Sequence, residues 1–333
     1  MGKLTPISYM ETKVDIESIY GQVKKEVGLE DPKTISYVVP TGSLSLDKAL
    51  GIGGYPSGRV TELYGAEHGG KTTLAMEACI QAQKMGLPLG YIDNEHALDV
   101  DYFKKMGIQG EPNKDWMHLT PDTGEGTWRA IEILLDKGIK FIVVDSVSAM
   151  TPEAEIRGDF GEAQMGLQAR MMSQGFRKTI AKISQQEAIV IFINQIRMKL
   201  GVMFGSPETT TGGQSLKFYA SIRLDVRQVG DDIKGSDEII GKYSRLKVVK
   251  NKCSVPNKVA LVPIIWGKGI DRASEILDEM LAKGVITKSG SFFSYMDHKF
   301  NGRVNMLPFV EENIEEFEKY LEKKNGKTES EEK

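Results

Sequence analysis

The sequence predicts an α/β protein built on a mostly parallel central sheet. Apolar runs of strand length alternate with helix-like segments from about residue 36 to residue 269. Several of these runs are continuously apolar, such as residues 141–144 and 189–193, as expected for strands that are buried on both faces of a parallel sheet. Strands are expected at residues 59–64, 87–93, 116–120, 140–145, 188–194, 220–226, 244–250 and 258–266.

Two shorter regions flank this core and complete three expected domains: 1–35, 36–269 and 270–333. An amphipathic helix over residues 13–27, with Thr12 and Asp15 resembling a capping box, precedes an extended segment at 34–39. Its apolar stripe, which packs either on its own domain or on a neighbouring copy, consists of Ile16, Ile19, Tyr20, Val23 and Val27. Beyond residue 269, a helix (273–283), a hairpin-like stretch (289–299) and a charged helix (311–324) indicate a small α+β domain with a disordered tail.

The composition excludes several classes of protein. The chain has 333 residues and 40% hydrophobic content, enough for a large core. It has neither an apolar run long enough to span a membrane nor the apolar core of a secretory signal, so a cytoplasmic protein is expected. Cys79 and Cys253 lie far apart and offer no metal spacing and no disulfide framework. The net charge is −3, with acidic residues concentrated in 311–333.

The most informative motif is a complete phosphate loop between a strand and a helix. It follows the strand at 59–64 and precedes a helix-like run at 73–85. Its residues are Gly65, Ala66, Glu67, His68, Gly69, Gly70, Lys71 and Thr72, followed by Thr73. The glycines let backbone N–H groups curl around phosphates, Lys71 reaches the β and γ oxygens, and Thr72 supplies a hydroxyl to Mg²⁺. The alternative is a glycine-rich turn that fits the pattern by chance.

Polar residues stand at the ends of three predicted strands. Asp145 ends the strand at 140–145 and is expected to support the Mg²⁺ shell. Glu95 follows the strand that ends at Asp93 and is the candidate for activating water, with an ion pair or a helix cap as its alternative role. Gln195 follows the strand at 188–194, where an amide can contact the γ-phosphate.

Two long loops with basic residues at their roots predict a contact with a nucleic-acid backbone. They span residues 157–166 and 201–213, and the second is too long for an ordinary connection. The proposed phosphate contacts are Arg170, Arg177, Arg197 and Lys199, and Met165 is a candidate for insertion between bases. The alternative is that these cations pair with acidic surface groups or face solvent.

The motifs together resemble the bacterial-type RecA recombinase family. The resemblance rests on residues 41–47, the phosphate loop, residues 92–99, residues 165–174 and residues 192–213. It is strong over about 36–269 and looser over the carboxy-terminal domain. It implies a RecA-like P-loop ATPase core that uses ATP and Mg²⁺, forms helical filaments on single-stranded DNA, pairs it with double-stranded DNA and exchanges strands in recombination, repair and the SOS response to DNA damage.

The same resemblance implies roles for individual residues. Glu95 becomes the catalytic carboxylate, Gln195 the γ-phosphate sensor, and Asp99 with Tyr102 the adenine contacts. Lys250 and Lys252 look like groups that reach the ATP of the neighbouring subunit. The family resemblance also extends the second loop to residues 195–213. The DNA-binding set implied by the family adds Gly166, Ser173, Gly212 and Gly213, and the subunit-interface set comprises Ile16, Ile19, Phe204, Lys217 and Phe218.

Some positions depart from the family pattern. Glu67-His68-Gly69 stands where Glu-Ser-Ser is usual, Asn94 where Ala is usual, and Gln164 where His is frequent. None of these changes removes a catalytic group, so they bear on the rate of turnover. The mixed Lys and Glu tail leaves open whether it restrains duplex binding, and the sequence also leaves open a phage origin.

Two other functions remain open at this stage. A hexameric motor such as a replicative helicase would use the same ATP residues in a closed ring. A regulatory scaffold would use its filament to stimulate the self-cleavage of an SOS-type repressor. The amino-terminal helix and the extended segment after it favour an open filament, because a head-to-tail contact that does not close propagates.

Overall fold

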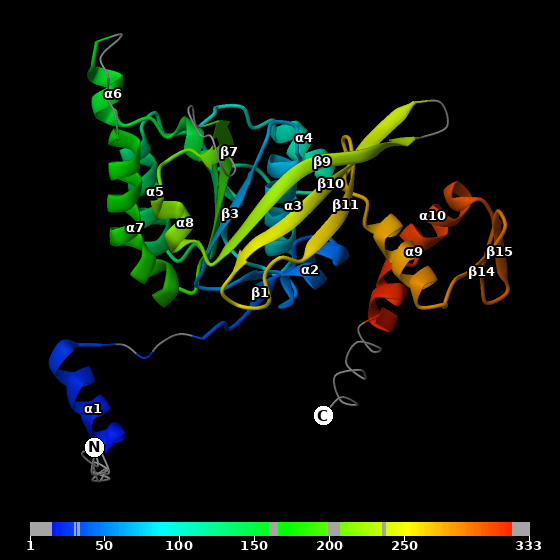
Figure 1. The fold of residues 1–333 in the computed structure, drawn as a ribbon, viewed down its shortest axis with the longest axis horizontal. Coiled ribbons are helices and arrows are strands. Elements are labelled where there is room, and N and C mark those ends of the chain that lie inside the picture. The colour runs from blue at the N-terminus through cyan, green and yellow to red at the C-terminus, as the bar shows by residue number, and fades with distance from the viewer. Residues whose placement is uncertain are drawn as a thin grey trace, which may run out of the picture. The chain divides into compact units, whose positions relative to one another are not determined.

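The computed structural model describes residues 15–29, 31, 34–159, 166–198, 207–234 and 238–321. The chain divides into two compact units, Met1–Thr34 and Ile35–Lys333. In the larger unit, a ten-stranded sheet has the order β12-β11-β10-β9-β3-β7-β6-β4-β5, with β8 paired to β7 (Figure 1). Its strands are β3 (Val60–Gly65), β4 (Leu89–Asp93), β5 (Met117–Leu119), β6 (Phe141–Asp145), β7 (Ile189–Met198), β8 (Glu208–Thr210), β9 (Ile222–Lys234), β10 (Ile239–Asn251), β11 (Val259–Ile265) and β12 (Gly269–Ile270).

The sheet is parallel through its middle and antiparallel at one side. Every pairing from β9 through β3, β7, β6 and β4 to β5 is parallel. The pairings of β9 with β10, β10 with β11 and β11 with β12 are antiparallel. The expectation of a mostly parallel α/β sheet is therefore confirmed, and the parallel strands bring their carboxyl ends to one edge.

Helices cover both faces of the sheet, because alternate residues of its central strands point to opposite sides. In β7, Ile191 and Ile193 join a core cluster with α2, α3 and α4, whereas Val190 and Phe192 join a second cluster with α5, α7 and α8. Figure 1 shows α5 and α7 on the other side of β3 and β7 from α3. The helices are α2 (Leu44–Leu50), α3 (Lys71–Lys84), α4 (Val100–Met106), α5 (Gly124–Asp136), α7 (Leu167–Gln185) and α8 (Ser215–Tyr219), and the smaller elements are β1 (Val38–Val39), β2 (Tyr55–Pro56), η1 (Val147–Ala149) and α6 (Glu153–Arg157).

The carboxy-terminal elements form a small core of their own. They are α9 (Arg272–Ala282), β13 (Thr287–Ser289), β14 (Phe292–Tyr295), β15 (His298–Asn301), α10 (Arg303–Glu312) and a further helical stretch at 314–321. The predicted hairpin is thus a three-stranded sheet. The single helix predicted at 311–324 is wrong: helix begins at Arg303 and is interrupted at Asn313. Pro308 argues against a helix locally, yet burial of Met306 and Val310 keeps α10 in place. Residues 322–333 lie outside the described part of the chain.

The smaller unit contains helix α1 (Ile16–Val27). Asp15 is its N-cap, and its side chain accepts a hydrogen bond of 3.1 Å from the backbone N–H of Ser18. The helix therefore begins later than the predicted residue 13, and Thr12 lies outside the described residues. No residue of α1 is buried, so its apolar stripe is exposed.

Candidate active site

The glycines of the phosphate loop hold it tightly against β9. A Cβ atom at Gly65 would stand 2.0 Å from the carbonyl oxygen of Val226, and one at Gly69 would stand 3.0 Å from the same oxygen. Gly70 has a φ of +91° and is the N-cap of α3. A tightly turned glycine-rich loop at a helix N-terminus is the arrangement that binds phosphate groups. These residues therefore fit a nucleoside triphosphate.

Lys71 and Thr72 begin α3 beside the end of β6. Lys71 Nζ donates a hydrogen bond of 2.6 Å to the carbonyl of Ala66 within the loop. Burial lowers the pKa of Lys71, although Asp145 and Glu95 oppose this effect. Thr72 Oγ1 donates to Asp145 Oδ2 at 3.1 Å, so the two residues predicted to serve one cation are in contact.

Asp145 is buried at the carboxyl end of β6. Burial raises its pKa to about 6, while a hydrogen bond of 2.7 Å from the hydroxyl of Tyr91 acts in the opposite direction. In the described part of the chain, no three His, Cys, Asp or Glu side chains gather as a metal cluster. The donors here, one carboxylate and one hydroxyl, suit Mg²⁺, which usually takes its remaining ligands from phosphates and water.

Glu95 is exposed at the sheet edge, in the turn after β4. Its backbone N–H donates to Asp93 Oδ1 at 3.2 Å, which shapes the turn. The hydroxyl of Ser146 donates to Glu95 Oε1, and Gln195 Nε2 donates to the same oxygen at 3.4 Å. Glu95 follows β4, Ser146 follows β6 and Gln195 lies within β7, so three neighbouring strands bring their residues to one carboxylate. The predicted end of the strand at 194 and start of the loop at 195 are wrong, because β7 continues to Met198 and pairs there with β8.

A buried polar network leads from Gln195 to the second loop. The backbone N–H of Gln195 donates to Asn194 Oδ1 at 2.9 Å, and the hydroxyl of Thr211 donates to the same oxygen at 2.5 Å. Asn194 Nδ2 donates to the fully buried Glu62 at 2.9 Å, and Glu62 also forms an ion pair with Arg223. The strand end that carries Gln195 is thus joined by hydrogen bonds to the loop that follows β8.

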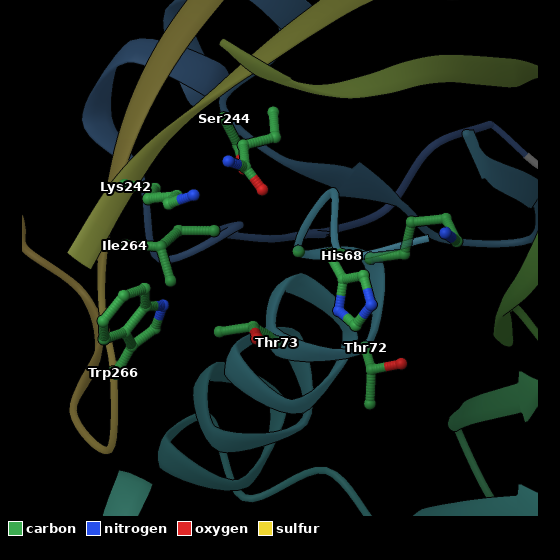
Figure 2. Close-up of a pocket in the computed structure, with 10 residues that line it drawn as sticks. His68, Thr72, Thr73, Lys242, Ser244, Ile264 and Trp266 are labelled. Atoms are coloured by element: carbon green, nitrogen blue, oxygen red, sulfur yellow. The ribbon is translucent and has the colours of Figure 1, made fainter. Parts of the chain in front are cut away.

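A cavity of about 640 Å³ lies beside the phosphate loop. Figure 2 shows His68 next to Thr72 at the start of α3, with Lys242, Ile264 and Trp266 on the opposite wall. Ser244 fixes the loop to β10, because its hydroxyl donates to the carbonyl of Gly69 at 2.6 Å. None of the residues of the wall from β9, β10 and β11 was predicted from the sequence; they are Gln228, Lys242, Ser244, Ile264 and Trp266. The available signal was Trp266, an aromatic residue at the end of a predicted strand.

The two predicted adenine contacts lie near this cavity without lining it. Asp99 is the N-cap of α4, and its side chain accepts a hydrogen bond of 3.0 Å from the N–H of Tyr102. The hydroxyl of Tyr102 accepts a hydrogen bond of 3.4 Å from the N–H of Gly267, next to Trp266. Their proposed contact with a base stays a prediction.

The described end of the second predicted DNA loop packs against the start of α7, the helix that follows the first predicted loop. Gln168 Nε2 donates to the carbonyl of Val147 at 2.9 Å, and its Oε1 accepts from the N–H of Gly212 at 3.1 Å. Gly213 packs so closely that a Cβ there would stand 2.7 Å from the Cβ of Ala169. Arg170 and Arg177 on α7 and Arg197 on β7 are exposed; Gly166 is the N-cap of α7 and Ser173 is half-buried. Met165, Lys199 and Phe204 lie outside the described residues.

A second group of predicted residues gathers around α8. Lys250 Nζ donates to the carbonyl oxygens of Lys217 and Phe218, at 2.6 Å and 3.0 Å. Lys252 Nζ donates to the carbonyl of Phe218 at 3.4 Å, and the Phe218 side chain is 71% exposed. None of these four residues lines the cavity beside the phosphate loop. The two lysines therefore lie outside the cavity beside the phosphate loop of their own chain, and their proposed contact with a neighbouring subunit stays a prediction.

Comparison with known proteins assigns the chain to a family. The model of the RecA N-terminal domain matches residues 10–271. Protein RecA of Geobacter sulfurreducens is 46% identical over 315 residues, 92% of each chain. The Brucella anthropi protein is 48% identical over 303 residues, 90% of this chain and 83% of its own. The Bartonella quintana protein is 52% identical over 279 residues, 83% of this chain and 79% of its own.

The chain belongs to the RecA family. Membership of the RecA family makes it a DNA-dependent ATPase of the P-loop class that acts in homologous recombination and DNA repair. The resemblance inferred from the motifs is therefore confirmed. Among the described helices, none has the length and apolar character that crossing a membrane requires.

Proposed function

We propose that the nucleotide is ATP, held with Mg²⁺ at the N-terminus of α3. The observation that carries this assignment is the contact of 3.1 Å between Thr72 Oγ1 and Asp145 Oδ2, beside the phosphate loop. When bound, Mg²⁺ neutralises the charge of the β- and γ-phosphates. Lys71, which the fold buries beside these residues, supplies a further positive charge to the phosphate oxygens.

In this proposal, Glu95 orients the attacking water and accepts its proton, because it is the exposed carboxylate at the sheet edge next to the phosphate loop. Ser146 and Gln195 hold its side chain through their hydrogen bonds to Oε1. Gln195 responds to the presence or loss of the γ-phosphate. The hydrogen bonds that Gln195 and Thr211 donate to Asn194 couple this response to the second loop. ATP hydrolysis thereby controls the affinity of the protein for DNA.

DNA contact is assigned to the surface around the start of α7, the helix that follows the first loop and contacts the second. Arg170, Arg177 and Arg197 are exposed cations at the roots of the loops and contact phosphates. Gly212 and Gly213 let the second loop approach α7 closely, so this loop lies beside the helix that carries Arg170 and Arg177. The other residues predicted to bind DNA remain part of this proposal; they are Met165, Gly166, Ser173 and Lys199.

Assembly is assigned to α1 and to the residues around α8. Residues 1–35 bind a neighbouring copy through the apolar stripe of α1, including Ile16 and Ile19, and residues 36–269 form the ATPase core. Phe218, Lys217 and Phe204 belong to the receiving surface, and Lys250 with Lys252 reach the neighbour's ATP. Residues 270–333 form the carboxy-terminal domain. The resulting filament acts on DNA in the cytoplasm and also stimulates the self-cleavage of an SOS-type repressor.

Electron microscopy with single-stranded DNA and a non-hydrolysable ATP analogue tests this proposal. Long helical filaments are expected, whereas closed rings would favour a hexameric motor and overturn it. A strand-exchange assay between circular single-stranded DNA and a linear duplex separates the recombinase from a scaffold that only polymerises. Filaments without exchanged products would leave the scaffold as the better description.

A further inference from the structure

Asn94 lies in a buried hydrogen-bonded link between α5 and the residues around Glu95. Asn94 is 8% exposed and Thr127 is fully buried. The hydroxyl of Thr127 donates to Asn94 Oδ1 at 2.6 Å. Asn94 Nδ2 points the other way and donates to the carbonyl of Ser146 at 3.4 Å, while its backbone N–H donates to the carbonyl of Asp145 at 2.7 Å.

This link is connected to the candidate catalytic residue at two points. Asn94 directly precedes Glu95 in the turn after β4, and Ser146, whose carbonyl Asn94 binds, donates its hydroxyl to Glu95 Oε1. The side chain of Glu95 is exposed, so it takes little of its orientation from packing. The position of the Glu95 side chain therefore depends on the residues that hold the turn after β4 and on those that hold Ser146, its hydrogen-bonding partner.

We infer that Asn94 and Thr127 are positioning residues for ATP hydrolysis, which tie the turn bearing Glu95 and the backbone of Ser146 to α5. The inference rests on the proposed role of Glu95. An active-site group must be held within a fraction of an ångström of its working position by neighbours that are themselves fixed. A buried amide that bridges a helix and two strand ends provides such support, and an alanine at position 94 does not.

The link is chemically asymmetric, which makes it testable. The Thr127 hydroxyl has a second acceptor in its own helix, the carbonyl of Thr123 at 3.2 Å. If the Asn94 amide is removed, that hydroxyl still has a partner. If the Thr127 hydroxyl is removed, the buried Asn94 Oδ1 loses its donor. Leaving one buried acceptor without a donor lowers the free energy of unfolding more than removing both partners of the hydrogen bond.

The experiment measures DNA-stimulated ATP hydrolysis and thermal unfolding for Thr127→Val, Thr127→Ser, Asn94→Ala and the Asn94→Ala/Thr127→Val double variant. Thr127→Val should lower kcat about fivefold, the factor that corresponds to one hydrogen bond of ordinary net strength, with KM for ATP unchanged. Thr127→Ser keeps the hydroxyl and should keep kcat. The double variant should unfold at a higher temperature than Thr127→Val, but its kcat should stay as low as that of Thr127→Val.

Thr179→Val is a matched control. Thr179 is also fully buried in a helix, and its hydroxyl donates at 2.9 Å to the carbonyl of Gly175, four residues earlier. This variant should change stability without changing kcat. An unchanged kcat in Thr127→Val, or a kcat that recovers together with stability in the double variant, would overturn the inference because the link would then be structural only.

A Glu95→Gln background separates the inference from the function on which it rests. If Thr127 acts through Glu95, adding Thr127→Val to Glu95→Gln should leave the residual rate unchanged. A further fivefold loss in that background would overturn the inference while the role of Glu95 stands. Full hydrolysis by Glu95→Gln alone would instead remove the proposed role of Glu95, and the inference with it.

Discussion

Gln195 Nε2 donates a hydrogen bond of 3.4 Å to Glu95 Oε1, so the proposed sensor touches the proposed base. The two residues are a hundred positions apart in the sequence and meet because β4 and β7 end at the same edge of the sheet. The backbone of Gln195 is bonded in turn to Asn194, and Asn194 is bonded to Thr211. A displacement of the Gln195 side chain is therefore linked to the residues that position the second loop.

The first prediction concerns the base. Glu95→Gln should bind ATP and form filaments but hydrolyse ATP at least about a hundredfold more slowly, because an amide cannot accept the proton of the attacking water. Single-turnover hydrolysis and filter binding of nucleotide measure the two properties separately. Glu111→Gln, which changes an exposed carboxylate paired with Lys104, is the control and should keep the parental rate. Parental hydrolysis by Glu95→Gln would show that another group activates water.

The second prediction concerns the phosphate loop. Lys71→Ala should abolish nucleotide-dependent DNA binding, because no neighbour can replace its charge and hydrogen bonds on the phosphates. Lys84→Ala removes a lysine from the last turn of the same helix and should bind DNA normally. Fluorescence anisotropy of labelled single-stranded DNA, with and without ATP, provides the measurement. ATP-dependent binding by Lys71→Ala would contradict the assignment.

The third prediction concerns assembly. Deletion of residues 1–33 should leave a folded ATP-binding core that no longer polymerises, because an isolated helix with an exposed apolar stripe gains its stability by packing on a partner. Val23→Asp places a charge on the stripe and should have the same effect. Ser18→Asp adds the same charge to a side chain outside the stripe and should still form filaments in sedimentation on single-stranded DNA. Long filaments from the truncated chain would mean that α1 packs on its own core.

Local sequence patterns were sufficient to predict the phosphate loop and the polar residues at the strand ends of the candidate site. The phosphate loop and the strand-end residues Asp145, Glu95 and Gln195 were predicted, because their signals lie within a few residues of each strand. The parallel order of the strands then brings these residues to one edge. Their roles remain predictions, whereas the contacts between them are observed.

The other half depends on contacts between distant parts of the chain. Ser244 contacts the phosphate loop, and Trp266 lines the cavity beside it, only because β10 and β11 pair antiparallel beside β9. The bond between Asn94 and Thr127 spans 33 residues and leaves no periodic pattern in the sequence. The start of α10 at Arg303 was not predicted, because the helix contains Pro308 and depends on the burial of Met306 and Val310.

The fourth prediction concerns pH. Burial raises the pKa of Asp47 from 3.8 to about 7, although hydrogen bonds from Thr41 oppose the shift. Because the folded-state pKa is the higher one, the protonated carboxyl stabilises the fold fully below about pH 4, and this stabilisation is lost as the pH rises through about 7. Asp47→Asn retains an oxygen for the N–H of Thr41. It should unfold on the order of 5 °C higher than the parent at about pH 8 and at a similar temperature at about pH 4. A difference that is constant with pH would show that Asp47 does not titrate in this range.

The last prediction tests whether DNA is held through its backbone. Arg197 is exposed at the end of β7, two residues beyond Gln195, so Arg197→Ala should weaken binding to unrelated single strands by a similar factor and leave the affinity for ATP unchanged. The slope of log affinity against log salt should fall in magnitude by roughly 0.7, the value for one lost phosphate contact on a single strand. Lys182→Ala is the control, because Lys182 forms an ion pair with Asp136 at 2.9 Å near the opposite end of α7 from the loops. A loss confined to one DNA sequence would indicate base recognition, and an unchanged slope with intact binding would mean that Arg197 contacts protein or solvent instead of phosphate.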